Sequence, residues 1–104
     1  MHFTLKQLRY FVTAGEFNSV TKAAETLHVS QPSISSAILH LEDVTGLQLF
    51  VRHHAQGLSL TQAGRKFVLK AKQLLQDAEG LGHYASTLGE DIAGSLRIVG
   101  FPTF

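Results

Sequence analysis

Residues 19–35 constrain this chain more than any other part of its sequence. Four apolar residues recur there at helical spacing and define one face of a short helix over residues 20–27: Val20, Ala23, Ala24 and Leu27. The two alanines allow another helix to approach closely. Because a second helix is signalled only three residues later, the segment predicts two helices joined by a tight turn, a helix-turn-helix.

The start of the second helix is marked by three signals. Ser30 is a favourable N-cap, because its hydroxyl can accept a hydrogen bond from a free amide of the first turn. Pro32 lies in that first turn, where its missing N–H has no cost. Val29 before the cap and Ile34 after it form a hydrophobic staple. These signals predict a helix over residues 31–45, which Gly46 ends.

This second helix has a small and polar outer surface. Its core-facing residues are Ile34, Ile38, Leu41 and Thr45, and the remaining surface carries Gln31, Ser33, Ser35, Ser36, Ala37 and His40. Such a helix fits the major groove of DNA, which is about 12 Å wide. The pattern therefore predicts a DNA-binding module. A plain pair of amphipathic helices in a bundle is the alternative.

Another helix is predicted before this unit, over residues 5–15. Thr4 and Gln7 have the spacing of a capping box, and Phe3 with Leu8 forms a staple. Phe17 is expected to cover the core between this helix and the next. The stripe predicted to be buried consists of Leu5, Leu8, Phe11 and Val12.

The hydrophobic period changes after residue 46. Residues 49–60 contain two short strand-like runs around a loop, which predicts a two-stranded hairpin, or wing. Arg52, His53 and His54 lie near its tip, where they would reach the DNA backbone or the minor groove. A solvated loop is the alternative for the two histidines. No metal site is expected there, because cysteines and nearby carboxylates are missing.

A long helix is predicted from residue 61 to residue 88, with Thr61 as its cap. Its apolar residues recur at alternating spacings of four and three, as Phe67, Ala71, Leu74, Ala78, Leu81, Ala85 and Leu88. A single exposed helix cannot bury such a heptad seam, so we expect a homodimer formed through this helix. Packing onto the chain's own core is the alternative, but residues 1–60 are too few to cover the whole seam. Gly80 and Gly82 are poor helix residues and weaken the prediction locally.

The helical pattern is expected to stop near Gly89. Residues 90–94 are typical of a polar hinge, and the alternation over residues 95–102 predicts a strand. Because a lone strand is marginally stable, we expect residues 89–104 to be the hinge and first strand of a second domain that is absent from this fragment. The predicted fold is mainly α, with a winged helix-turn-helix over residues 1–60 and a long dimerisation helix over residues 61–88.

The distribution of charge agrees with a DNA partner. Residues 1–72 contain eight Lys and Arg and four Asp and Glu, a net charge of +4, whereas residues 73–104 have a net charge of −3. The absence of cysteine excludes disulfides and thiolate zinc sites. No apolar run is long enough to span a bilayer and no signal peptide is recognisable, so we expect a cytoplasmic protein without a membrane partner.

Two other classes of function remain as alternatives. An enzyme is disfavoured, because the chain has no phosphate-cradling Gly-rich loop, and its adjacent acids, such as Glu42 and Asp43, have the pattern of solvated side chains. A winged helix used for protein interaction is the stronger alternative, with the heptad helix as its working surface. The absence of Lys and Arg from residues 31–45 favours this second alternative.

Together these motifs resemble the N-terminal part of the LysR-type transcriptional regulators, a bacterial family. The resemblance covers nearly the whole chain. It is carried by residues 5–11, 23–24, 27–35, 38, 41–42, 46, 49–52 and 60–64, and residues 94–98 resemble the entry to that family's effector domain. It implies a winged helix-turn-helix, a dimerising linker helix and a small-molecule co-inducer bound by a domain outside this chain. No cofactor is therefore expected in the chain itself.

The resemblance also implies roles for single residues. The base-facing positions in the major groove would be Gln31, Pro32, Ser33, Ser35 and Ser36. The contacts with phosphates and from the wing would come from Ser19, Thr21, Lys22, Ser30, Arg52, His53 and His54. Full-length family members usually form tetramers through their effector domains, whereas this chain should reach only a dimer that binds double-stranded DNA.

The chain departs from the family pattern in two places. Ser36 stands where the family often has Arg, and the wing carries His53, His54, Ala55 and Gln56 where a second Arg is common. The helix over residues 31–45 therefore lacks an Arg fork to guanine, the commonest specific base contact. We expect the affinity to depend on phosphate contacts and on DNA shape.

Overall fold

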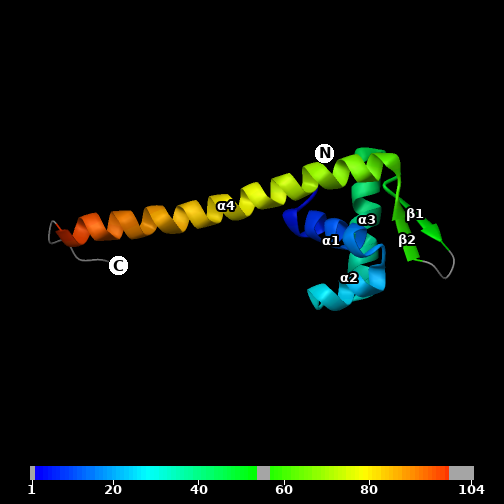
Figure 1. Ribbon diagram of the computed structural model, residues 1–104, viewed down its shortest axis with the longest axis horizontal. Coiled ribbons are helices and arrows are strands. Elements are labelled where there is room, and N and C mark those ends of the chain that lie inside the picture. The colour runs from blue at the N-terminus through cyan, green and yellow to red at the C-terminus, as the bar shows by residue number, and fades with distance from the viewer. Residues whose placement is uncertain (1, 54–56, 99–104) are drawn as a thin grey trace.

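The computed structural model describes the backbone of residues 2–53 and 57–98 and the side chains up to residue 93. Its elements are α1 (Leu5–Phe17), α2 (Val20–Leu27), α3 (Gln31–Thr45), β1 (Phe50–His53), β2 (Gly57–Leu60) and α4 (Gln62–Ile98). The first five elements and the beginning of α4 form a small globular part, from which α4 extends as a single rod (Figure 1). The mainly α, winged helix-turn-helix fold that the sequence predicts is confirmed.

Local signals set the beginnings of α1, α2 and α3 and the end of α3 as predicted. The Thr4 N–H donates to Gln7 Oε1 (2.9 Å) and the Gln7 N–H donates to Thr4 Oγ1 (3.1 Å), a complete capping box. Ser19 and Ser30 cap α2 and α3, since each hydroxyl accepts a hydrogen bond from the backbone amide three residues later. Gly46 ends α3 in the left-handed conformation, with φ +69°.

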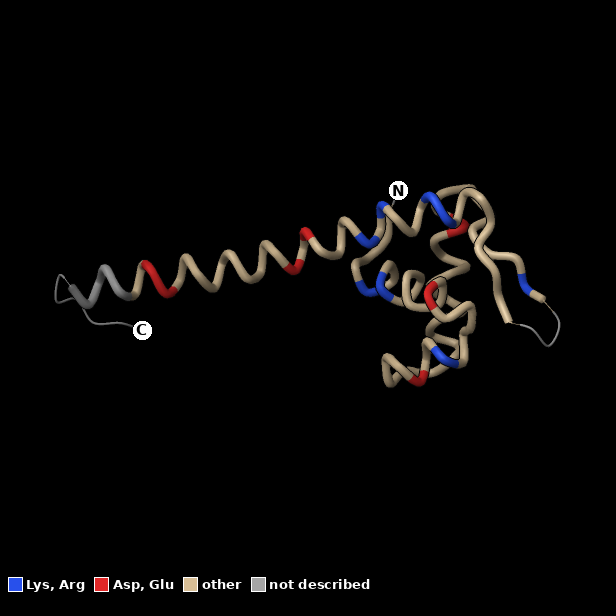
Figure 2. Tube along the Cα trace, in the orientation of Figure 1, with Lys and Arg blue, Asp and Glu red and all other residues tan. Residues whose placement is uncertain are grey.

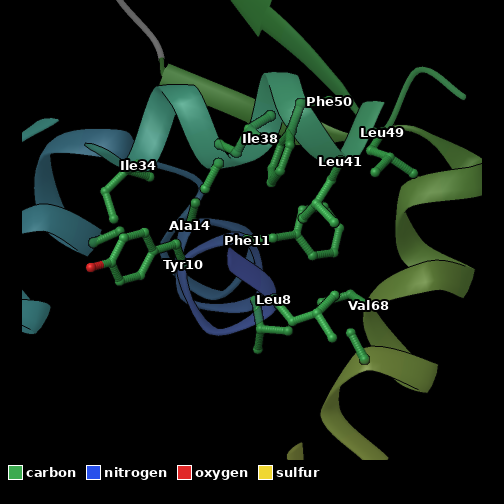
Figure 3. Close-up of a cluster of buried hydrophobic side chains, with 14 of the residues drawn as sticks. Leu8, Tyr10, Phe11, Ala14, Ile34, Ile38, Leu41, Leu49, Phe50 and Val68 are labelled. Atoms are coloured by element: carbon green, nitrogen blue, oxygen red, sulfur yellow. The ribbon is translucent and has the colours of Figure 1, made fainter. Parts of the chain in front are cut away.

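Phe11 occupies the centre of the hydrophobic core. Its ring meets the rings of Phe50 and Phe67 edge-on, with centroid distances of 5.3 and 5.4 Å. α1 packs against both α3 and α4, so side chains from three helices and the hairpin converge around this ring (Figure 3). The core thereby fixes α3 on one side of α1 and the beginning of α4 on another.

Three predictions about the core are wrong. Leu5 and Phe17 are 48% and 40% exposed, because each lies six residues from Phe11, about 120° around the helix from it. Ala37 is buried rather than on the surface of α3, because α1 packs against that side of the helix. α1 also continues past Gly15 to Phe17, where Asn18 ends it in the left-handed conformation (φ +52°).

The hairpin is held close to the turn between α1 and α2. β1 and β2 pair antiparallel, from Phe50 opposite Leu60 to His53 opposite Gly57. The Leu58 N–H donates to the Asn18 carbonyl oxygen (3.0 Å). Gly57 has φ +81°, and a Cβ there would lie 2.5 Å from the same oxygen. Glycine is therefore required at this position for the wing to approach the turn.

α4 begins with the predicted cap and then packs onto the core. The Gly64 N–H donates to Thr61 Oγ1 (2.9 Å). The side of the helix that faces the core carries the buried residues Gly64, Val68, Ala71 and Leu75, and Phe67 packs beside them. Phe67 and Ala71, the first two members of the predicted dimer seam, therefore belong to the chain's own core. The exposed part of the seam begins at Leu74.

The end of α4 differs from the prediction. The helix passes Gly89 and continues to Ile98, so the predicted hinge over residues 90–94 and the predicted strand from residue 95 are wrong. Residues 99–102 of that strand lie outside the described residues. A helix pairs its backbone groups internally, whereas a strand without a neighbour leaves them unpaired. A second domain after residue 89 stays a prediction.

Over the described ranges, no helix is both long and apolar enough to cross a bilayer.

Candidate nucleic-acid interface

The turn between α2 and α3 has the geometry of a helix-turn-helix. His28 adopts the left-handed conformation (φ +57°), which histidine tolerates better than most residues. The Val29 N–H then donates to the Ala24 carbonyl oxygen (3.0 Å), and the Val29 side chain packs against the core. Ala23 and Ala24 are both buried. The turn therefore holds α2 and α3 in a defined orientation.

The side of α3 that is turned away from the core forms a continuous exposed surface. It carries Pro32, Ser36, Leu39 and Asp43, which recur at helical spacing, and this set is called the outer face of α3. The opposite side is buried and carries Ile34, Ala37, Ile38 and Leu41. Leu39 was not among the predicted base-facing residues, although its seven-residue spacing from Pro32 places it on the same side.

The other predicted base-facing residues flank the outer face. Gln31 and Ser33 are exposed, and Ser35 is half-buried. The Ser33 hydroxyl lies 2.8 Å from Ser30 Oγ, so it takes part in the cap of α3. Of the five predicted residues, Pro32 and Ser36 are the two that belong to the outer face itself.

A hollow of about 270 Å³ lies between the beginning of α2 and the wing. Its lining includes four of the predicted phosphate-contacting residues, Ser19, Thr21, Arg52 and His53, together with Val20, Gly57 and Leu58. The N-terminal end of a helix is positively polarised and Arg52 adds a full charge, so a phosphate is the chemical group that this hollow favours. His53 Nε2 lies 2.7 Å from Ser59 Oγ, which orients the imidazole along the wing.

Two further predicted phosphate contacts are outside the lining of this hollow. Lys22 is exposed in the first turn of α2, and Ser30 is exposed at the beginning of α3. His54 lies outside the described residues. In residues 2–53 and 57–98 no group of three His, Asp or Glu side chains could hold a metal ion.

The charged residues divide along the molecule. Lys and Arg occur, beside some Asp and Glu, over the globular part and the beginning of α4 (Figure 2). Lys22 belongs to α2 and Arg52 to β1. Beyond Lys72, the charged side chains that the structure describes are all acidic, namely Asp77, Glu79, Glu90 and Asp91. The largest group of cations lies at the beginning of α4, as Arg65, Lys66, Lys70 and Lys72, whereas α2 and the wing contribute one cation each and α3 contributes none.

The rod of α4 carries a second surface, which no other part of the described chain covers. Leu74, Leu81 and Leu88 are exposed at heptad spacing, with Ala78 and Ala85 between them, and Ile92 extends the series by one turn. This set is called the apolar stripe of α4. Leu81, in its middle, is 68% exposed. Ile92 was not predicted, because the helix was expected to end before it.

Sequence comparison places these features in a known family. The family model described as "Bacterial regulatory helix-turn-helix protein, lysR family" matches residues 5–65. The RuBisCO operon transcriptional regulator of Allochromatium vinosum is 41% identical over 98 residues, which are 94% of this chain and 32% of that protein. The DNA-binding transcriptional dual regulator OxyR of Escherichia coli is 37% identical over 99 residues, 95% of this chain and 32% of that protein. The chain thus spans about a third of the length of these relatives.

Structural comparison agrees with the sequence. The CbnR DNA-binding domain, solved in complex with DNA, superposes with a TM-score of 0.78 at 35% identity, over 83% of this chain and 98% of that domain. The BenM DNA-binding domain, solved with catB site 1 DNA, gives a TM-score of 0.78 at 34% identity, over 83% of this chain and 96% of that domain. The chain therefore belongs to the LysR family of bacterial regulatory helix-turn-helix proteins and carries the helix-turn-helix DNA-binding domain of those transcriptional regulators.

Proposed function

We propose that this chain binds double-stranded DNA sequence-specifically, as a dimer, with α3 in the major groove. The observation that carries the proposal is the outer face of α3, which is continuous, exposed and free of Lys and Arg side chains. Such a face can approach the edges of the bases closely. The likeness to domains that were solved bound to DNA supports the same orientation.

Base recognition is assigned to the first turns of α3. Pro32 and Ser36 lie on the outer face, and Gln31, Ser33 and Ser35 lie beside it. Gln31 is the one side chain among them that can pair bidentately with adenine. Because α3 has no Lys or Arg, we expect phosphate contacts and DNA shape to supply most of the affinity.

Contacts with the DNA backbone are assigned to the hollow beside the wing. Ser19 and Thr21 present the N-terminal end of α2, and Lys22, Arg52 and His53 add donors around it. The wing would lie over the adjacent backbone or minor groove, and His54 is proposed as a further contact from it. Ser30 would serve a second phosphate at the beginning of α3.

Dimerisation is assigned to the apolar stripe of α4. Leu74, Ala78, Leu81, Ala85 and Leu88 are exposed or half-buried in the single chain, so a second copy is required to bury them. The small residues between the leucines suit a close crossing of two helices. Phe67 and Ala71 would support this interface from within the core.

The remaining parts of the proposal concern the longer protein. The curated relatives are about three times as long as the matched region. We propose that a co-inducer-binding domain follows the linker helix, that a tetramer forms through it, and that no cofactor binds to these 104 residues. A regulator of bacterial genes acts where the chromosome lies, which is the cytoplasm.

The proposal is tested by measuring binding to random-sequence duplex DNA over a series of salt concentrations, with light scattering on the same samples. We expect a dimer whose affinity falls steeply as salt rises, because bound phosphates release counterions. A well-folded dimer that binds no duplex even at low salt would refute DNA binding. That outcome would favour a protein-interaction module, which the uncharged α3 also suits.

Two substitutions separate base reading from backbone contact. Lys22→Ala should weaken binding to all duplexes by a similar factor and reduce the salt slope by about one phosphate. Gln31→Ala should cost about 1–3 kcal/mol on the preferred site only, and should relax the preference at one base pair. An equal loss on every sequence would remove Gln31 from base reading, and an unchanged slope would remove Lys22 from the backbone contacts.

A further inference from the structure

Leu39 is a leucine in the middle of the outer face of α3, and 58% of its surface is exposed. It lies two helical turns after Pro32 and close to Ser36. The buried residues Ile34, Ile38 and Leu41 fix the rotation of α3, so Leu39 cannot turn into the core. The hydrophobic core of the chain therefore does not include the Leu39 side chain, which stays exposed to solvent.

The chemistry of the outer face restricts what Leu39 can recognise. Its side chain has neither a donor nor an acceptor, and α3 has no Lys or Arg that could dominate the contact. In the major groove, thymine presents a C5-methyl group, which apolar side chains recognise by contact. We infer that Leu39 selects a thymine in the target site by packing against its C5-methyl group. This inference rests on the proposed entry of α3 into the major groove.

The position of Leu39 along α3 predicts where this thymine lies. Seven residues separate Pro32 from Leu39, a rise of about 10.5 Å along the helix axis. Leu39 therefore lies two helical turns further along α3 than Pro32. The next residue of the outer face is Asp43, whose carboxylate the DNA phosphates repel. Leu39 is therefore the last residue of the outer face that enters the groove, and its thymine marks the end of the half-site.

The test removes the methyl group alone. The 104-residue chain is used to select its preferred duplex from a random pool, and each thymine of that duplex is then replaced by deoxyuridine, one at a time. Fluorescence anisotropy measures the dissociation constant of each duplex. We expect one thymine per half-site whose replacement weakens binding about three- to five-fold, as the loss of one buried methyl contact does.

The same duplexes are then measured with Leu39→Ala. This variant should fold, because residue 39 is exposed and alanine favours a helix. It should bind the thymine duplex about as weakly as the wild type binds the deoxyuridine duplex, and the replacement should have no further effect on it. Leu69→Ala is the matched control, since Leu69 is a 67% exposed leucine on α4, and it should keep the wild-type response.

The possible results distinguish the inference about Leu39 from the proposed DNA-binding function. A response to deoxyuridine that persists in Leu39→Ala would overturn the inference, as would a target site in which no thymine responds. If Leu39→Ala binds too weakly to measure, Leu39→Val should bind measurably and show a smaller response than the wild type, and an undiminished response would also overturn the inference. A chain that selects no duplex at all would instead refute the proposed function.

Discussion

The two parts of α4 have the same secondary structure but very different surroundings. In the anchored part, residues 62–79, Gly64, Val68, Ala71 and Leu75 are buried against the core. Two ion pairs also join this part to α1, Arg9–Glu79 (2.9 Å) and Lys72–Glu16 (3.5 Å). In the distal part, residues 80–98, every side chain from residue 80 to residue 92 is exposed.

This difference shows that one helix can serve two separate purposes. The anchored part is stabilised by tertiary packing, which is the main source of helix stability in proteins. The distal part has no such packing in the single chain, and it contains three glycines, Gly80, Gly82 and Gly89, which are poor helix residues. We therefore expect the anchored part to govern folding, and the distal part to depend on a second copy.

The largest expected effect is that of Gly64→Ala in the anchored part. A Cβ at Gly64 would collide with the Leu49 carbonyl oxygen, which already accepts a hydrogen bond from the Thr61 N–H (3.0 Å). The backbone segments would have to separate, at a cost of about 3 kcal/mol in the free energy of unfolding. Urea denaturation of dilute protein measures this cost. An unchanged urea midpoint would show that the beginning of α4 is not tightly held.

Leu74 and Leu75 are neighbours in α4, but Leu75 is buried against the core and Leu74 lies on the apolar stripe. Alanine substitutions at these two positions test whether folding and dimerisation use different sides of α4. Leu75→Ala should lower the free energy of unfolding by about 2–3 kcal/mol, because Leu75 is buried against the core. Leu74→Ala, the matched control, should leave the stability of the dilute monomer nearly unchanged, since Leu74 is exposed. If urea denaturation showed the same loss of stability for both variants, the core-facing side of α4 and its apolar stripe would not be distinct.

A charge in the apolar stripe should separate association from folding. Leu81→Asp would place a carboxylate at the middle of the proposed dimer contact, where burial of an unpaired charge is unfavourable. We expect the dissociation constant of the dimer to rise at least tenfold, which is about 1.4 kcal/mol, while the globular part stays folded. Analytical ultracentrifugation measures the first quantity and near-ultraviolet circular dichroism the second. An unaltered dimer would move the interface away from the apolar stripe.

Most of the fold could be predicted because its signals are local. The capping box at Thr4, the caps at Ser19 and Ser30 and the left-handed Gly46 each depend on residues within one turn. The predictions that failed concern long-range contacts. The spacing of Phe67 and Ala71 is the same whether they face the core or a second helix, and only the position of α1 decides between the two. Likewise, residues 95–98 have a strand-like pattern but are helical.

The residues of the candidate site could be predicted from the sequence, but their positions relative to one another could not. The sequence identified Ser19, Thr21, Arg52 and His53 separately, whereas the hollow they share depends on the contact between the wing and Asn18. That contact requires the positive φ of Gly57, which no periodicity reveals. Leu39 could not be predicted from hydrogen-bonding groups, because its side chain is apolar, although it lies on the same helical face as Pro32.

The smallest expected effect, that of Gly80→Ala, tests the distal part most directly. No heavy atom lies within 4 Å of a Cβ built on Gly80, so alanine adds no collision. Position 80 is about 120° around the helix from the middle of the apolar stripe. Alanine should therefore stabilise the helix by up to about 1 kcal/mol without altering the dimer contact.

Hydrogen exchange of the amides near residue 80 measures this gain, and analytical ultracentrifugation checks the dimer. We expect slower exchange in the distal part and no change in the urea midpoint of the dilute globular part, because the two parts of α4 are stabilised separately. A weaker dimer would show that this side of α4 also meets a partner. A higher urea midpoint would show that the distal part folds together with the core. The anchored and distal parts of α4 would then differ in solvent exposure but not in how they are stabilised.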